Sequence, residues 1–128
     1  MFAANATIDT LMTRAQHTVA PSDRVSVADA AMRANGIHHL VVEDSGVLVG
    51  IVSALDVLRV APEARGETPV SDVMAADVQT IPMTATIRDT LDRFAAASFS
   101  ALPVVDATGK VVGIVTTTDL EQLLFSDY

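Results

Sequence analysis

Two short stretches of the chain are nearly the same: residues 50–57 read GIVSALDV and residues 113–120 read GIVTTTDL. Each begins with Gly-Ile-Val and then carries a hydroxyl residue followed three positions later by an aspartate, namely Ser53 with Asp56 and Thr116 with Asp119. An apolar run that changes to a hydroxyl residue and then to an acid is typical of a strand leading directly into a helix. The similarity of the two stretches predicts an internal repeat, in which each copy contains one such strand-to-helix step.

The repeat extends over almost the whole chain. An offset of 62 residues aligns Met12 with Met74 and Leu40 with Leu102, and beyond a one-residue insertion near Ala107 an offset of 63 aligns the two Gly-Ile-Val runs. Residues 61–69, APEARGETP, contain two prolines, a glycine and charged residues, which are typical of a linker. We predict a first repeat over residues 8–60, a linker over 61–69 and a second repeat over 70–125.

Both repeats have the same predicted order of elements, β-α-β-β-α. A short strand near residues 18–20 or 78–81 leads to a helix that starts near Ser22 and Asp23, or near Thr84, all of which are good N-cap residues. Gly36 is the predicted end of the first of these helices. Two strands joined by DSG or DATG turns follow, and a final helix covers residues 53–60 or 117–125.

Several strands are apolar on consecutive residues, as in LVV, LVGIV and VVGIV, so both faces of each sheet must be covered. Neither repeat could bury that much apolar surface alone. We therefore predict a mixed α/β (α+β) fold in which the two repeats pack sheet against sheet as one pseudo-twofold domain with the helices outside.

Charge and composition exclude several classes of function. The net charge is −8 and Lys110 is the only lysine, so the surface repels nucleic-acid phosphates and we expect no nucleic-acid binding. No run of about 18 apolar residues is free of charged or turn residues, so we expect no membrane span. The N-terminus lacks the pattern of a secretory signal and the chain has no cysteine, which favours a reducing cytoplasm.

Patterns typical of catalysis are missing as well. The chain has no cysteine nucleophile, no Walker-type glycine-rich loop and no recognisable Ser-His-Asp context. We therefore predict that the protein is not an enzyme and has no catalytic residues.

The order of motifs resembles a tandem pair of cystathionine-β-synthase (CBS) domains. The resemblance rests on Thr-Val-x-Pro or Thr-Ile-Pro, then Gly-Ile-His-His-Leu-Val-Val or Ser-Phe-Ser-Ala-Leu-Pro-Val-Val-Asp, then Gly-Ile-Val-[Ser/Thr]-x-x-Asp, and it covers about residues 8–125. It implies a regulatory module that binds AMP, ADP, ATP or S-adenosylmethionine in clefts between the repeats. It also implies a role as an energy or metabolite sensor.

The resemblance further implies a role for ten residues. The two aspartates, Asp56 and Asp119, would accept hydrogen bonds from ribose hydroxyls, and the two hydroxyl residues, Ser53 and Thr116, would contact phosphate or ribose. Backbone groups of the first strand of each repeat would frame the adenine, at Thr18 and Val19 and at Thr80 and Ile81. The basic pair that contacts phosphate in relatives corresponds to His38 and His39.

Physical reasoning on the repeated step leaves two alternatives open. A helix that starts directly after a strand presents free N–H groups and its positive dipole end, which suit a phosphate, and an ionised aspartate there can bind ribose hydroxyls. Alternatively, the hydroxyl residue and the aspartate form a capping box for the helix. That box prefers Glu or Gln, whose longer side chain reaches back to the cap N–H, so Asp in both copies favours ligand binding.

The histidines have structural alternatives too. His38 and His39 could instead be a solvent-exposed or packed pair at a strand start, and no spacing requires them to join His17 in a metal site. We therefore predict no metal.

Departures from the family pattern bear on the ligand. Val41 replaces the usual proline of the first copy, Ser100 and Ala101 are neutral where the first copy has histidines, and the chain is acidic. These features favour AMP or S-adenosylmethionine over a triphosphate.

The alternative function is a ligand-free dimeric interaction module. The apolar residues of the last predicted helix suit a homodimer contact, namely Leu120, Leu123, Leu124 and Phe125. In either case the protein would regulate a partner protein that the sequence does not name.

Overall fold

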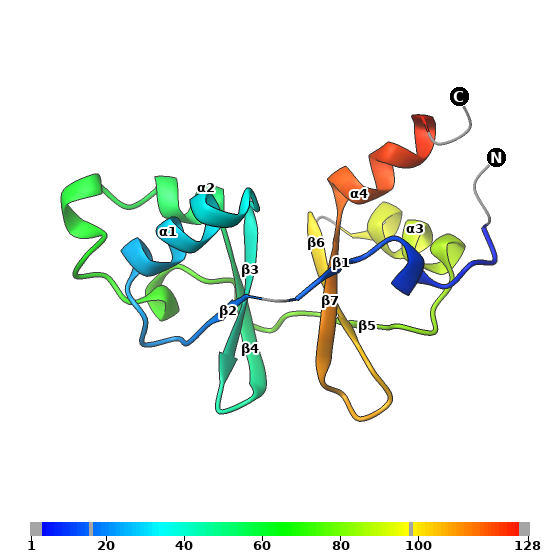
Figure 1. Ribbon diagram of the computed structural model, residues 1–128, viewed down its shortest axis with the longest axis horizontal. Helices are drawn as coiled ribbons and strands as arrows, with labels where there is room; N and C mark the ends of the chain where they lie inside the picture. Colours follow the sequence, from blue (N-terminus) through cyan, green and yellow to red (C-terminus); the bar gives the residue numbers. More distant parts are fainter. Residues whose placement is uncertain (1–3, 16, 98, 126–128) are drawn as a thin grey trace. The chain divides into compact units, whose positions relative to one another are not determined.

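The computed structural model describes residues 4–15, 17–97 and 99–125 (Figure 1). The chain forms two compact units. One unit is Ala15–Val78, and the other combines the residues up to Arg14 with those from Gln79 onward. Among the described residues each unit contains one β-sheet and two α-helices, so the predicted mixed α/β class is confirmed.

The unit Ala15–Val78 is built on a sheet with strand order β2-β3-β4. Its elements, in chain order, are β2 (Thr18–Val19), α1 (Val25–Asn35), β3 (His39–Asp44), β4 (Val47–Ser53), α2 (Ala54–Leu58), and the 3₁₀ turns η2 (Pro62–Ala64) and η3 (Val70–Asp72). Strand β2 runs parallel to β3 because α1 forms the crossover between them, and β4 returns antiparallel to β3. Apolar residues of α1, β3, β4 and α2 form its core.

The other unit repeats this plan with one additional strand, in the order β1-β7-β6-β5. Its elements are η1 (Ile8–Thr10), β1 (Thr13–Arg14), β5 (Ile81–Pro82), α3 (Ile87–Ala96), β6 (Ala101–Val105), β7 (Val111–Thr116), α4 (Thr117–Glu121) and η4 (Gln122–Phe125). Strand β5 is parallel to β6, and β7 is antiparallel to both β6 and β1. The predicted β-α-β-β-α order is therefore present in both repeats.

The first helix of each repeat starts later than predicted. Helix α1 has Arg24 as its N-cap, with no side-chain cap, because the carboxylate of Asp23 instead accepts a hydrogen bond from the amide of Ala20 at 2.8 Å. The prediction of a start at Ser22 and Asp23 was wrong for this reason. The helix ends as predicted at Gly36, whose φ of 62° is a left-handed conformation that glycine adopts without strain.

Helix α3 starts two residues beyond the predicted Thr84. Its N-cap is Thr86, whose hydroxyl accepts from the amide of Asp89 at 3.0 Å while the Asp89 carboxylate accepts from the amide of Thr86 at 3.2 Å. The sequence has Ser98 where the first copy has Gly36, and Ser98 is a weaker predicted helix end; this position lies outside the described residues.

The leading segment of each repeat packs into the unit formed by the rest of the other repeat. Ile8 is fully buried in the core of the unit that holds β5, β6 and β7, and its amide donates to the carbonyl of Ala85 at 2.7 Å. Its counterpart 62 positions later, Val70, is fully buried in the core of Ala15–Val78, and its amide donates to the carbonyl of Asp23 at 2.7 Å. Repeats in the sequence and compact units in the structure are therefore two different divisions of the chain.

This exchange explains the glycine that opens each Gly-Ile-Val run. A Cβ atom added at Gly50 would lie 2.7 Å from both the carbonyl oxygen of Ala75 and the sulfur of Met74. At Gly113 it would meet the sulfur of Met12 and, at 2.9 Å, the carbonyl oxygen of Thr13. Each glycine is needed because the exchanged segment crosses its strand at a distance that no side chain permits.

Both faces of the sheets are buried, as their consecutive apolar residues predict. Leu40 and Val42 on one face of β3 are 1% and 0% exposed, and Val41 on the opposite face is 2% exposed. In the other unit the neighbouring residues Leu102, Pro103 and Val104 of β6 are likewise buried.

The surface of the final helix differs in part from the predicted dimer contact. Leu120 is 8% exposed and belongs to the core of its own unit, and Leu123 packs against that core. Only Leu124 and Phe125, which are 69% and 72% exposed, present apolar side chains outward.

Candidate ligand-binding site

The step at the end of β4 holds Ser53 and Asp56 in a closed set of hydrogen bonds. The amide of Ser53 donates to Asp56 Oδ2 at 2.8 Å, and the Ser53 hydroxyl donates to the same oxygen at 3.0 Å. In return, the amide of Asp56 donates to Ser53 Oγ at 3.2 Å. This is a complete capping box on α2, so the structural alternative for these residues is realised.

The second copy has the same geometry at the end of β7. Thr116 donates to Asp119 Oδ2 from its amide at 2.9 Å and from its hydroxyl at 3.1 Å, and the amide of Asp119 donates to Thr116 Oγ1 at 3.3 Å. A third box of this kind, Thr86 with Asp89, lies outside the repeated motif. The shorter Asp side chain therefore reaches the cap amide in all three boxes, so the argument that Asp is too short for a capping box was wrong. Ligand binding by Asp56 and Asp119 stays a prediction.

The amides at the start of α2 and α4 are less available to a phosphate than predicted. The amide of Ala54 donates to the carbonyl of His38 at 2.9 Å, and that of Thr117 donates to the carbonyl of Ser100 at 3.0 Å. The amides of Asp56 and Asp119 are bound within the capping boxes. The predicted phosphate seat of free N–H groups is thus largely occupied by the unit's own backbone and side chains.

The remaining carboxylate oxygens distinguish the two copies. Asp56 Oδ1 lies 3.8 Å from Nη1 of Arg59, three residues farther along the same helix, which is a spacing that allows an ion pair. The Asp56 side chain is 17% exposed and that of Arg59 is 78% exposed. In the second copy Gln122 stands at the position of Arg59, and within residues 99–125 Asp119 makes no ion pair.

The other candidate residues of the first repeat lie on the same sheet. His39 is the register partner of Ser53, so the start of β3 adjoins the capping box, and His38 directly before it is exposed. Thr18 of β2 is exposed and pairs with Val41, two residues along β3 from His39. The side chain of Val19 is buried in the core, so it can contribute to a site only through its backbone.

Candidate residues of the second repeat are arranged in the same way. Thr116 is the register partner of Ala101, whereas Ile81 pairs with Val104, three residues farther along β6. Ile81 is 2% exposed and packs in the core. The carbonyl of Thr80 accepts a hydrogen bond from Arg93 at 3.5 Å.

The structure adds two findings on other classes of site. Across residues 4–15, 17–97 and 99–125 no three His, Asp or Glu side chains gather as a metal site would require. None of the helices in these ranges is long and apolar enough to cross a bilayer.

Comparison with known proteins identifies the family. The CBS domain model matches residues 8–63 and 70–126. CBS domain-containing protein YhcV of Bacillus subtilis is 32% identical over 114 residues, which make up 88% of this chain and 80% of YhcV. Inosine-5'-monophosphate dehydrogenase of Thermoplasma acidophilum is 32% identical over 112 residues, which are 88% of this chain but 22% of that enzyme. The chain therefore spans about a fifth of the enzyme's length.

A solved structure supports the same assignment. The crystal structure of CBSX2 in complex with AMP superposes with a TM-score of 0.77 at 28% sequence identity and covers 95% of this chain and 98% of CBSX2. Two matched repeats with the predicted order of elements confirm the resemblance seen in the motifs, and the chain belongs to the CBS domain family as a tandem CBS pair.

Proposed function

We propose that this chain is a regulatory module of the cytoplasm that binds an adenosine-containing ligand, AMP in the first place, and modulates a partner protein. The absence of cysteine is consistent with a reducing compartment. The similarity to CBSX2, which was crystallised with AMP, supports the choice of ligand. S-adenosylmethionine, ADP and ATP are the competing ligands, and the acidic balance of the chain disfavours the triphosphate.

One observation carries the proposal. In each repeat the capping box fixes an aspartate through Oδ2, so the carboxylate is oriented in advance and Oδ1 takes no part in the box; in the first copy Oδ1 is paired with Arg59 instead. A pre-oriented ionised acceptor suits the two adjacent hydroxyls of a ribose, since each charge-assisted hydrogen bond contributes about 1.5–3 kcal/mol. Capping and ribose binding are then compatible uses of the same side chain.

The first copy is the better site for a phosphorylated ligand. His39 is the register partner of Ser53, His38 precedes it, and Arg59 pairs with Asp56. In the second copy the neutral residues Ser100, Ala101 and Gln122 hold the equivalent positions. When a ribose displaces Arg59 from Asp56 Oδ1, the exposed guanidinium becomes free to pair with the phosphate. We therefore expect AMP to bind first at Asp56.

Asparagine variants test the proposal without removing the cap. In Asp56→Asn or Asp119→Asn the amide oxygen can still accept from the cap N–H, but an NH₂ group replaces the ribose acceptor Oδ1. We expect the variant at the occupied copy to bind AMP about 10–100-fold more weakly, since one or two charge-assisted bonds are lost. Binding is measured by isothermal titration calorimetry with AMP, ADP, ATP and S-adenosylmethionine.

Asp89→Asn is the matched control. It alters a capping box of the same geometry that lies outside the repeated motif, so it should lower stability by a similar amount, about 0.5–1 kcal/mol, and leave AMP binding unchanged. The proposal is wrong if no adenosine compound binds the parent protein, or if all three variants reduce binding equally.

The exposed apolar side chains favour a second function, a ligand-free dimeric interaction module. Leu55 and Leu58 of α2 are each 67% exposed, and Leu124 and Phe125 at the end of the chain are similarly exposed. Such residues are typical of a contact with another protein, either a second copy or the regulated partner. If analytical ultracentrifugation shows a dimer and calorimetry shows no ligand, this second function replaces the first.

A further inference from the structure

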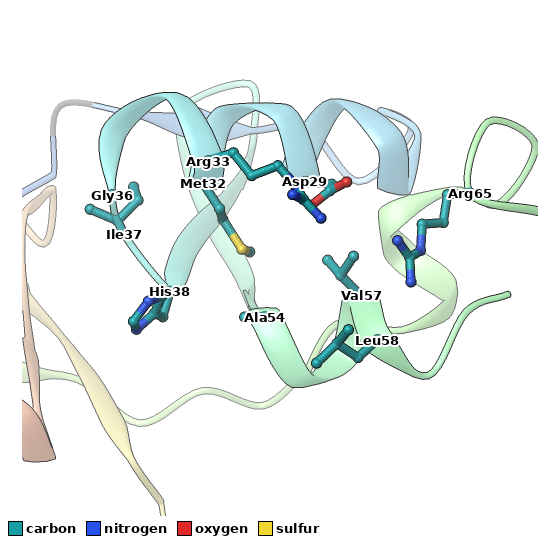
Figure 2. A pocket seen from close by; sticks show the side chains of 10 residues that line it. All are labelled: Asp29, Met32, Arg33, Gly36, Ile37, His38, Ala54, Val57, Leu58 and Arg65. Carbon is teal, nitrogen blue, oxygen red and sulfur yellow. The ribbon is translucent and has the colours of Figure 1, made fainter. Parts of the chain in front are cut away.

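A cavity lies between α1 and α2 in the unit Ala15–Val78 (Figure 2). Ser53 and Asp56 do not line it, although their neighbours Ala54 and Val57 do. Its volume is about 270 Å³. The lining residues come from α1 and the turn that follows it, from α2, and from the segment after η2; they are Asp29, Met32, Arg33, Gly36, Ile37, His38, Ala54, Val57, Leu58 and Arg65. Of the residues that the CBS resemblance assigns to a ligand, the cavity contains His38 alone.

The floor of the cavity is apolar. Met32 and Val57, which are 5% and 3% exposed, form it together with Ala54 and Ile37, which pack against the same core. Leu58 extends this apolar surface outward, because its side chain is 67% exposed. Binding of an apolar ligand to such a floor is favourable, because it removes apolar surface from water.

Charged groups stand at the rim. Figure 2 shows the imidazole of His38 and the guanidinium of Arg65 at opposite ends, with Arg33 and Asp29 together along α1. Arg33 Nε donates to Asp29 Oδ1 at 2.8 Å, so these two charges largely neutralise each other. Arg65 thus supplies the net positive charge of the rim.

Arg65 is held in place by the chain itself. Its Nε donates to the carbonyl of Val60 at 3.0 Å, which leaves the two terminal nitrogens of the guanidinium for another acceptor. The residue is half-buried, and Figure 2 shows its head group turned toward the side of the cavity where Val57 lies. The chain as a whole carries a net charge of −8, so the positive charge of Arg65 beside the cavity is opposite in sign to the charge of the molecule.

We propose that this cavity binds a small organic carboxylate with an apolar body. The carboxylate pairs with the terminal nitrogens of Arg65, for which a planar two-oxygen acceptor is the best match, and the apolar body lies on Met32 and Val57. A cavity of about 150 Å³ holds a benzene molecule, so a volume of 270 Å³ has room for roughly 10–12 non-hydrogen atoms. The adenosine proposal does not enter this inference, so either can fail alone.

Three compounds that differ in the head group test the proposal: 3-phenylpropanoate, 3-phenylpropanol and 3-phenylpropylamine. Each is titrated into ¹⁵N-labelled full-length protein, and the backbone amide shifts are followed by NMR. We expect the carboxylate to shift amides of residues 29–38 and 54–65 and to bind at least about 10-fold more tightly than the alcohol, because one charge-assisted pair distinguishes them. The amine should bind most weakly.

Two variants and a control locate the site. Arg65→Gln should weaken binding of the carboxylate about 10-fold or more, and Ala54→Leu, which fills the cavity from α2, should abolish it while the amide shifts of the other unit stay in place. Arg88→Gln removes an exposed arginine from α3 and should change nothing. The proposal is overturned if the alcohol binds as tightly as the carboxylate or if Arg65→Gln binds like the parent. It is also overturned if the amide shifts of residues 29–38 and 54–65 change with protein concentration but not on addition of 3-phenylpropanoate.

Discussion

Replacing Gly50 by alanine tests why the motif begins with glycine. The new methyl group would lie 2.7 Å from the carbonyl oxygen of Ala75 and equally close to the sulfur of Met74. That carbonyl accepts a hydrogen bond from the amide of Ile51 at 3.0 Å, and the amide of Ala75 donates to the carbonyl of Ile51 at 2.8 Å, so this backbone segment is held in place. Overpacking of this kind costs about 1–3 kcal/mol. Alanine also restricts the unfolded chain, which returns about 0.4–1 kcal/mol. We expect a net loss of about 1–2 kcal/mol.

Gly66→Ala is the matched control, since nothing lies within 4 Å of its Cβ position and its φ is not positive. It should leave stability unchanged or raise it by about 0.4–1 kcal/mol. Both variants are measured by urea unfolding followed by far-UV circular dichroism, with the slope checked for equality. If Gly50→Ala is as stable as Gly66→Ala, the exchanged segment does not cross β4 as described and the explanation of the glycine is wrong.

Two further predictions concern the exchanged segment and the turn before β7. Ile8→Ala should lower stability by about 2–4 kcal/mol, because Ile8 is fully buried in the core of the unit that holds β5, β6 and β7. In hydrogen exchange the variant should lose amide protection in residues 79–125 rather than in residues 17–78. An equal loss of protection in both ranges would contradict the exchange of leading segments. The hydrogen bond from the Thr108 hydroxyl, with those from the amides of Thr108 and Lys110, lowers the pKa of Asp106 below 3.8. The contribution of ionised Asp106 to stability is therefore present above about pH 4 and lost as the pH falls through the lowered pKa. Thr108→Val should raise the pKa of Asp106 in an NMR titration, because the hydroxyl donor is removed. An unchanged pKa would show that the Thr108 hydroxyl is not the cause of the lowered value.

The repeat, the fold class and the order of elements could be predicted because they depend on local pattern. Apolar runs, turn residues and the 62-residue offset are visible without tertiary contacts. Helix starts were less accurate. Asp23 is a good N-cap by type but bonds the preceding turn, and nothing in the sequence separates these two uses of the same carboxylate.

The exchange of leading segments between the two repeats could not be predicted from the sequence. Ile8 and Val70 are equivalent apolar residues, and either would fill the core of either repeat, so pattern alone does not say which core each enters. The two glycines were read only as part of a strand leading to a helix. Their close contact with Met12 and Met74 becomes visible only when the segments are placed.

The candidate site was predicted in part. Spacing identified Ser53 with Asp56 and Thr116 with Asp119, and the structure closes both pairs. Spacing could not reveal that the amide of Ala54 bonds the carbonyl of His38, because that contact depends on the register between β3 and β4. Arg65 was missed for a similar reason, since it lies in a segment that reads as a linker.

The most direct test of the central claim is an NMR titration of ¹⁵N-labelled parent protein with AMP, in which amide shifts are compared at three capping boxes. The account predicts saturable shifts at Ser53 and Asp56, with weaker changes at Thr116 and Asp119 and none at Thr86 and Asp89. Equal shifts at all three boxes, or no shift at any AMP concentration, would contradict the claim that the repeated aspartate is a ribose acceptor.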